Sequence, residues 1–243
     1  MSENGPIRIG ASGFSYREWL GRFYPPGLPA TGMLAYYAQR MTTVEINYTF
    51  RAIPKPAMLQ GWVARTPEHF RFALKAPERI THHARLRNAD ESLNRFAAAA
   101  ESLGHRLGPA LFQLPPDFKC DIHLLSDFLG LLGGRFRAAF EFRNRSWFGD
   151  ATFETLKAAG ASLCIAESDK LKTPVVKTAS LVYVRLRQSS YDGQALAEWA
   201  ARLGQLAADG SEVYVFFKHE AAAPELASSL ERLIGQSSEP GGR

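Results

Sequence analysis

Cysteine and long apolar segments are scarce in this sequence. Its two cysteines, Cys120 and Cys164, form no CxxC pair, so the sequence indicates reduced thiols and no disulfide framework. No apolar run is long enough to cross a membrane, and the first residues lack both the basic start and the apolar core of a secretory signal. We therefore expect a soluble protein of the cytoplasm that makes no membrane contact.

The familiar motifs of nucleotide and hydrolase sites are also missing. The chain contains no GxGxxG, no Walker loop, no HExxH and no GxSxG sequence. Dinucleotide enzymes, nucleotide hydrolases and serine hydrolases therefore have no support, and no nucleotide cofactor is expected. A linker rich in Gly, Pro or Ser is absent from the centre of the chain, which favours one domain.

The composition indicates a globular, mildly basic protein. Apolar residues make up 46% of the chain and charged residues 22%. These proportions provide a sizeable core and exclude a disordered or fibrous chain. The formal net charge of +5 favours anionic partners through long-range attraction.

Apolar segments of strand length recur along the whole chain, and helix patterns lie between most of them. The clearest helix pattern covers residues 90–103, where apolar side chains recur every three or four positions before Gly104. The segment 170–180 has no clear helix pattern. The expected strands are 7–11, 43–47, 71–75, 110–114, 138–142, 162–167, 181–186 and 213–218. The other expected helices are 31–40, 121–132, a short one from Asp150, 194–208 and 224–234.

This alternation predicts an α/β fold, a single (β/α)8 TIM-type barrel with parallel strands, over residues 1–235. The strands are apolar almost throughout, as expected where a parallel sheet is covered on both faces. A doubly wound open sheet is the alternative. Residues 236–243 are expected to form a flexible C-terminal tail.

The stretch 138–147, AAFEFRNRSW, changes from apolar to charged where its strand ends. Because side chains alternate along a strand, Ala139, Glu141 and Arg143 share one face. Other strands end in a similar way, and a parallel barrel brings these ends to one rim, where TIM barrels carry their sites. The side chains expected to contact a ligand there are Ser12, Asn47, Lys75, Gln113, Arg143, Trp147, Asp169, Arg185, Arg187 and Lys218.

The residue types at this rim favour an anionic, phosphate-bearing ligand. Lysine and arginine side chains surround a few carboxylates, and the paired donors of a guanidinium match phosphate oxygens. The leading hypothesis is hydrolysis of a phosphodiester or phosphate ester, with Glu45 or Glu141 as general base and His219 as general acid. The alternative is a non-catalytic barrel that binds nucleic acid.

Other interpretations use the same residues. Salt bridges that simply close the barrel mouth would need no ligand, and Glu141 with Arg143 would form one of them. A glycosidase is disfavoured because the rim is too cationic for an oxocarbenium-like transition state. A single Mg²⁺ on Glu45, Glu141 or Asp169 is compatible with the sequence, but no residue is assigned as a metal ligand.

The long connection 13–29 is rich in aromatic residues, including Trp19, Phe23 and Tyr24, and also carries arginines. Such residues can stack on nucleic-acid bases. In long loops they more often pack the loop against the barrel, and this is the favoured interpretation.

Several strings occur in order between Gly10 and His219: GASGFSYREWLGRFYPPGLP, TVEIN, FALKAPERITH, LFQLPPDF, EFRNRSW and YVRL. Together they resemble the YecE-like family, also called domain of unknown function 72. The resemblance implies a TIM barrel related to the endonuclease IV and sugar isomerase group, and it implies no activity. The chain departs from the family pattern at Arg51, at Arg187–Gln188 and at residues 218–220, so the resemblance does not extend to a shared substrate.

Overall fold

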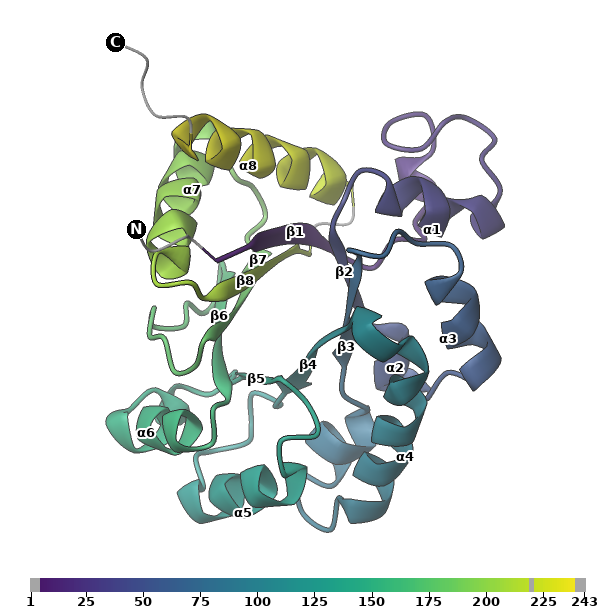
Figure 1. Ribbon diagram of the computed structural model, residues 1–243. Coiled ribbons are helices and arrows are strands. Elements are labelled where there is room, and N and C mark those ends of the chain that lie inside the picture. The colour runs from purple at the N-terminus through teal and green to yellow at the C-terminus, as the bar shows by residue number, and fades with distance from the viewer. Residues whose placement is uncertain (1–4, 219–220, 239–243) are drawn as a thin grey trace.

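Eight parallel strands close into a barrel in the computed structural model of this chain, which describes residues 5–218 and 221–238 (Figure 1). Each strand pairs with the next along the chain, and β1 pairs with β8, so the sheet has no free edge. The predicted TIM-type barrel is confirmed, and the open-sheet alternative is wrong. The strands are β1 (Ile7–Ser12), β2 (Thr43–Ile46), β3 (Arg71–Lys75), β4 (Leu107–Gln113), β5 (Ala138–Glu141), β6 (Ser162–Ser168), β7 (Leu181–Arg187) and β8 (Glu212–Phe217).

Helices follow the strands and surround the barrel, as Figure 1 shows. The segment between β6 and β7 contains no helix, as its sequence predicts. Two helices after β2 were not expected: α2 is a single turn, and α3 buries only Leu59, so neither shows a clear apolar period. The helices are α1 (Ala30–Ala38), α2 (Tyr48–Arg51), α3 (Pro56–Val63), α4 (Asp90–Ala100), α5 (Ile122–Leu132), α6 (Asp150–Ala158), α7 (Gly193–Ala207) and α8 (Ala223–Ser238).

Helix α5 illustrates how local sequence sets these elements. Asp121 caps its N-terminus, where the side chain accepts a hydrogen bond from Leu124 N at 3.0 Å. Gly133 ends it with a left-handed backbone, φ 54°, which glycine adopts without steric cost. Between these residues, Leu125 and Phe128 face the sheet and are buried.

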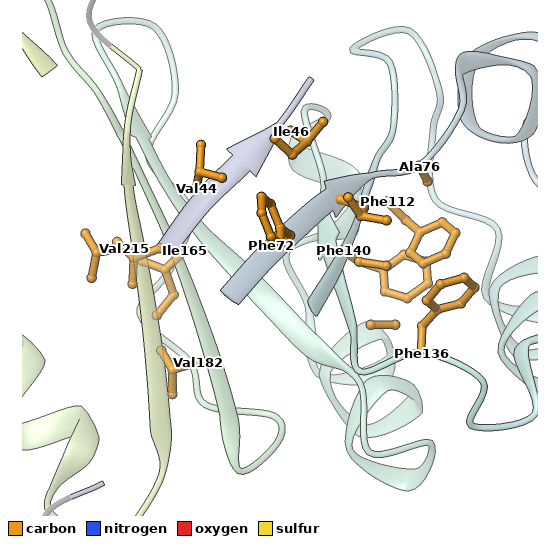
Figure 2. Close-up of a cluster of buried hydrophobic side chains, with 14 of the residues drawn as sticks. Val44, Ile46, Phe72, Ala76, Phe112, Phe136, Phe140, Ile165, Val182 and Val215 are labelled. Carbon is orange, nitrogen blue, oxygen red and sulfur yellow. The ribbon is translucent and has the colours of Figure 1, made fainter. Parts of the chain in front are cut away.

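The barrel has two hydrophobic layers because side chains alternate along each strand. Outward-facing residues such as Val44, Phe72 and Phe140 pack in the layer between sheet and helices (Figure 2). A second buried cluster contains Ala73, Leu111, Ala139, Cys164, Leu181, Tyr183, Tyr214 and Phe216. These residues alternate with the outward-facing ones, so they fill the barrel interior. Side chains two positions further along the same strands therefore lie at the C-terminal mouth.

The first connection packs against the barrel, as the favoured interpretation predicts. Trp19 and Tyr24 are each only 1% exposed. The Trp19 ring stacks on Tyr37 of α1 with a centroid distance of 6.4 Å. These two rings are therefore not available to stack on nucleic-acid bases.

The C-terminal segment differs from its prediction. Helix α8 continues to Ser238, so residues 236–238 are helical instead of forming the start of a tail. Residues 239–243 of the expected tail lie outside the described chain. Among the described helices, none is long and apolar enough to span a membrane.

Candidate functional site

A buried ion-pair network occupies the mouth of the barrel. Arg185 of β7 bridges two carboxylates: its Nη2 donates to Glu45 Oε1 at 2.8 Å, and its Nη1 donates to Glu141 Oε2. Ser12 Oγ also donates to Glu45 Oε1 at 2.6 Å, and the Tyr183 hydroxyl donates to Glu45 Oε2 at 2.8 Å. Four strands thus contribute to one network, in which Glu45 is fully buried and Arg185 is 1% exposed.

Glu141 is surrounded by arginines. Besides the bond from Arg185, its Oε1 accepts from Arg143 Nε at 3.0 Å and from Arg187 Nη1 at 3.2 Å. Gln113 lies beside it in the strand register and helps to lower its pKa, although Gln113 Nε2 makes no hydrogen bond of acceptable geometry within the described residues. These side chains, which the sequence places at one rim, therefore lie together, and Glu141 and Arg143 form the ion pair of the alternative interpretation.

The two glutamates are held in their ionised form. Burial alone would raise the pKa of Glu45, but Arg185 and hydrogen bonds from Ser12 and Tyr183 lower it. Burial likewise opposes ionisation of Glu141, and the nearby arginines, led by Arg185, hold its pKa far below the ordinary value. A carboxylate with so low a pKa is a weak base at neutral pH. The geometry thus favours a structural role for Glu45 and Glu141 over the expected role as general base.

Among the ligand-contact residues predicted from the sequence, Lys75 has a pKa close to neutral pH. It lies at the end of β3 and is 9% exposed. Its Nζ lies 3.9 Å from the centre of the Phe50 ring, and no described carboxylate is within salt-bridge distance of it. Burial, followed by the positive charge of Arg185, lowers the pKa of Lys75 to about 7. The expected ligand-binding cation is therefore partly neutral at physiological pH.

Neither His82 nor Phe50 was among the site residues predicted from the sequence. The His82 ring lies edge-on to Phe50 with a centroid distance of 4.9 Å. Burial and the charges of Lys75 and Arg143 lower the pKa of His82. The position of His82 shortly after the end of β3 was the one feature of the sequence that could have indicated a place near the mouth. How close its ring comes to Phe50 and Lys75 depends on the loop conformation, which the sequence does not show.

The loop that carries His82 has an unusual backbone. Residues Arg79–His83 form a π-helical turn, η2. Three residues that follow, Arg85, Leu86 and Asn88, have left-handed φ values of 48°, 68° and 45°. Left-handed φ values are unfavourable for residues other than glycine, and π-helical turns are rare; both features occur frequently at functional sites. The strained segment therefore supports a site at this side of the mouth.

A cavity of about 330 Å³ opens beside the network. Arg187 Nε near it is buried and has no hydrogen-bond partner within residues 5–218 and 221–238. The volume suits a small organic molecule. The polar side chains that line the cavity are Glu141, Arg143, Ser168, Lys170, Thr173 and Arg187.

Two other expected residues lie near the mouth. Asn47 follows β2 as the N-cap residue of α2 and is partly buried. Lys218 follows β8, where burial and the charges of Arg185 and Arg187 lower its pKa. The expected general acid His219 lies outside the described residues.

Asp169 is not part of the mouth network. Strand β6 presents Cys164 and Ala166 to the barrel interior, so Ser168 continues this inner phase and lines the cavity. Asp169 lies in the exposed loop beyond, where its carboxylate accepts a hydrogen bond from Ser189 N at 3.1 Å. Ser168 was not predicted from the sequence, because the site residue at this strand end was chosen from its charged neighbours, Glu167 and Asp169.

Trp147 was expected to contact the ligand, but it is a core residue. Its side chain is fully buried, and its ring stacks on Phe142 with a centroid distance of 4.5 Å. The indole Nε1 donates to Phe118 O at 2.8 Å. The short helical turn Arg145–Trp147 directs the ring back into the wall of the barrel.

The donor set at the mouth does not fit a divalent cation. In the described part of the chain, no three His, Cys, Asp or Glu side chains lie close enough to hold a metal ion. The carboxylates of Glu45 and Glu141 already bond Arg185, which a Mg²⁺ ion would have to displace. The neighbouring arginines would also repel it, and Asp169 is bound elsewhere.

Acid is expected to weaken the network. Folded-state pKa values of Glu45 and Glu141 are lowered, so their stabilising contribution is complete above about pH 4.5 and is lost as the pH falls below it. Urea denaturation should show a steep loss of unfolding free energy below about pH 4.5. Glu141→Gln should be less stable at neutral pH and less sensitive to acid. Parallel pH profiles for the two proteins would contradict this prediction.

The closed sheet and the polar mouth define the class of this protein: it is a parallel (β/α)8 barrel of the TIM type, with its candidate site at the C-terminal strand ends. A family model described as "Protein of unknown function DUF72" matches residues 8–241. The chain therefore belongs to the DUF72 family, as the resemblance of its motifs implies.

Relatives of this chain are found in several bacteria. The UPF0759 protein YecE of Escherichia coli K12 is 34% identical over 143 residues, which cover 58% of this chain and half of that protein. The UPF0759 protein YunF of Bacillus subtilis is 26% identical, with 88% of each chain covered. These names identify no activity.

Solved structures support the fold. A DUF72 family protein from Thermotoga maritima superposes with a TM-score of 0.84 at 25% identity, over 95% of this chain and 99% of that one. A DUF72 family protein from Enterococcus faecalis has a TM-score of 0.79 at 21% identity, over 97% and 99% of the two chains. The second likeness concerns the fold alone.

Proposed function

We propose that the barrel mouth binds a small, phosphate-bearing anion. The observation that carries the proposal is the arrangement of Arg143 and Arg187, which line the cavity and each donate one hydrogen bond to Glu141 among the described residues. A guanidinium has five N–H groups, so most of theirs remain available to a ligand. Glu45 and Glu141 are outnumbered by the cations around them, which include Arg185 and Lys218, and the excess positive charge favours an anion.

The reaction that we propose first is hydrolysis of a phosphate ester or phosphodiester. Arginine donors would stabilise the charge that develops on the phosphate oxygens. The acid–base work would fall to Lys75 instead of the glutamates, because its pKa of about 7 lets it accept and return a proton at neutral pH. This proposal keeps the substrate class suggested by the sequence and changes the residue that acts.

A non-catalytic nucleic-acid-binding barrel has less support. The cavity of about 330 Å³ accommodates a small ligand, not a polymer along its length. Trp19 and Tyr24, which carry much of the aromatic surface of the first connection, are buried. Nucleic-acid binding is therefore the alternative that the experiments must distinguish from binding of a small anion.

Orthophosphate binding, measured by calorimetry, tests the proposed site. Arg187→Met should weaken binding at least about tenfold, because a charge-assisted hydrogen bond contributes about 1.5–3 kcal/mol. Arg95→Met is the matched control: it removes the same charge from the exposed face of α4, where Arg95 pairs with Glu91. Control and wild-type affinities should agree. Equal affinities in all three proteins would overturn the site.

Turnover is tested separately with p-nitrophenyl phosphate and its bis ester, each with and without EDTA. Lys75→Met should abolish release of p-nitrophenol while leaving orthophosphate binding in place. Absence of release from the wild-type protein under every condition would overturn the hydrolase part. Tighter binding of short single-stranded DNA than of orthophosphate, with a salt slope reduced in Arg187→Met, would favour the nucleic-acid alternative.

A further inference from the structure

Lys75 has the position of a reactive amine inside the barrel mouth. Ala73, two residues earlier on β3, belongs to the interior cluster, so Lys75 projects from the same inner face at the C-terminal end. Its exposed fraction of 9% leaves the side chain largely shielded from water but not closed off. Phe50 provides an apolar surface 3.9 Å from Nζ.

The carboxylates that would normally hold a lysine as ammonium are engaged elsewhere. Glu45 bonds Ser12, Tyr183 and Arg185, and Glu141 bonds three arginines. No salt bridge to Lys75 occurs within the described chain. Burial, Arg185 and Arg143 disfavour the ammonium form and together outweigh the attraction of Glu45 and Glu141, which is why the pKa of Lys75 is about 7. A desolvated lysine beside another cation is the usual arrangement of a nucleophilic amine.

Arg143 connects this amine to the proposed anion site. It lines the cavity and follows β5, which is separated from the Lys75 strand β3 by β4 alone, and its charge contributes to lowering the pKa of Lys75. In the proposed complex, the ligand bonds Arg143 and Arg187 through its phosphate and spans the barrel mouth to the end of β3. A second reactive group on that ligand would then meet the amine.

We infer that Lys75 forms an imine with the carbonyl group of a phosphorylated aldehyde or ketone bound in the mouth. This inference rests on the proposed phosphate site and not on the proposed hydrolysis, in which Lys75 would act as acid and base instead, and it specifies the class of ligand. The neutral Lys75 Nζ attacks the carbonyl carbon: an N–C bond forms, the C=O π bond breaks, and one proton passes from the nitrogen to the oxygen. The C–O bond of this carbinolamine then breaks, its hydroxyl group leaves as water with the remaining N–H proton, and a C=N bond forms.

Reductive trapping tests the inference directly. Pyridoxal 5′-phosphate carries both an aldehyde and a phosphate, and borohydride reduces its imine to a stable amine, which adds a defined mass. Peptide mapping of the wild-type protein should place this mass on Lys75. The initial rate of modification should rise as the pH increases through about 7, where the amine loses its proton.

5′-Deoxypyridoxal, which lacks the phosphate and has no hydroxyl group to close onto its aldehyde, separates the two proposals. It should modify Lys75 at least about tenfold more slowly than the phosphorylated aldehyde, and Arg187→Met should remove this difference. Lys75→Arg keeps a cation and should eliminate the mapped modification. Lys157→Arg is the matched control on exposed α6, where Lys157 pairs with Glu154, and should leave modification of Lys75 unchanged.

Failure of the imine and failure of the phosphate site would give different results. Modification spread over surface lysines with Lys75 unlabelled, while orthophosphate still binds, would overturn the imine and leave the anion site standing. Equal labelling of Lys75 by both aldehydes, without orthophosphate binding, would support the reactive amine and overturn the phosphate site.

Discussion

Arg185→Ala is expected to lower the free energy of unfolding by about 3–5 kcal/mol. Arg185 is 1% exposed and forms salt bridges to the carboxylates of both Glu45 and Glu141, which are themselves buried. Its removal leaves two negative charges in the barrel interior, and Glu45 then has no salt bridge among the described residues. Chemical denaturation monitored by circular dichroism measures the change.

A compensated variant distinguishes charge burial from simple loss of packing. Arg185→Met combined with Glu45→Gln and Glu141→Gln removes the buried carboxylates together with the arginine, so no uncompensated pair of negative charges remains. It should recover a large part of the stability lost in Arg185→Ala. A combined variant that is less stable than Arg185→Ala would show that the ion pairs stabilise the barrel beyond mutual neutralisation.

Trp147→Ala is expected to cost about 3–5 kcal/mol, as removal of a fully buried aromatic side chain commonly does. The ring stacks on Phe142 and contacts Phe118 edge-on, so its loss opens a cavity beneath the rim. Trp147→Phe keeps an aromatic ring but leaves Phe118 O without its indole donor, and should cost about 1–3 kcal/mol. Urea denaturation gives both values.

Orthophosphate affinity is the second measurement for Trp147. A core residue should change the affinity little in the conservative Trp147→Phe variant. If that variant keeps its stability but loses orthophosphate binding at least about tenfold, the ligand-contact role expected from the sequence is right and the packing role is incomplete.

The buried glutamates fix the positions of the arginine side chains at the mouth. Glu141 accepts hydrogen bonds from Arg143 and Arg187, and through Arg185 it is joined to Glu45. Side chains held in this way lose less conformational freedom when a ligand binds. The carboxylates therefore orient the arginines, while the remaining positive charge is available to an anion.

The strand ends show how far a sequence can locate a site. The polar residues at the strand ends, together with the barrel rule, placed Glu45, Glu141 and Arg185 at one rim, and in the structure Arg185 bonds both carboxylates. This works because all strands of a parallel barrel run in one direction, so their C-terminal ends converge whatever the loops do.

Residues beyond the strand ends could not be placed in this way. Asp169 and Trp147 lie in connections, where a single turn redirects the side chain and the two-residue period no longer applies. The positions of Phe50 and His82 also depend on connections and not on strands. The conformation of these connections, including the π-helical turn, brings the two rings together. No regular pattern in the sequence encodes that contact.

By itself, the sequence determined the alternation of eight strands with helices and the strand-end residues that gather at the mouth, because hydrophobic periodicity is a property of the chain alone. Closure of the sheet depends on the pairing of β1 with β8, which the structure shows. Only the tertiary structure decided how these residues are protonated. The ionised Glu141 and the partly neutral Lys75 depend on burial and on the distance to Arg185, which reaches them from a different strand. Electrostatic energy follows distance and desolvation in space, and neither quantity is set by spacing along the chain.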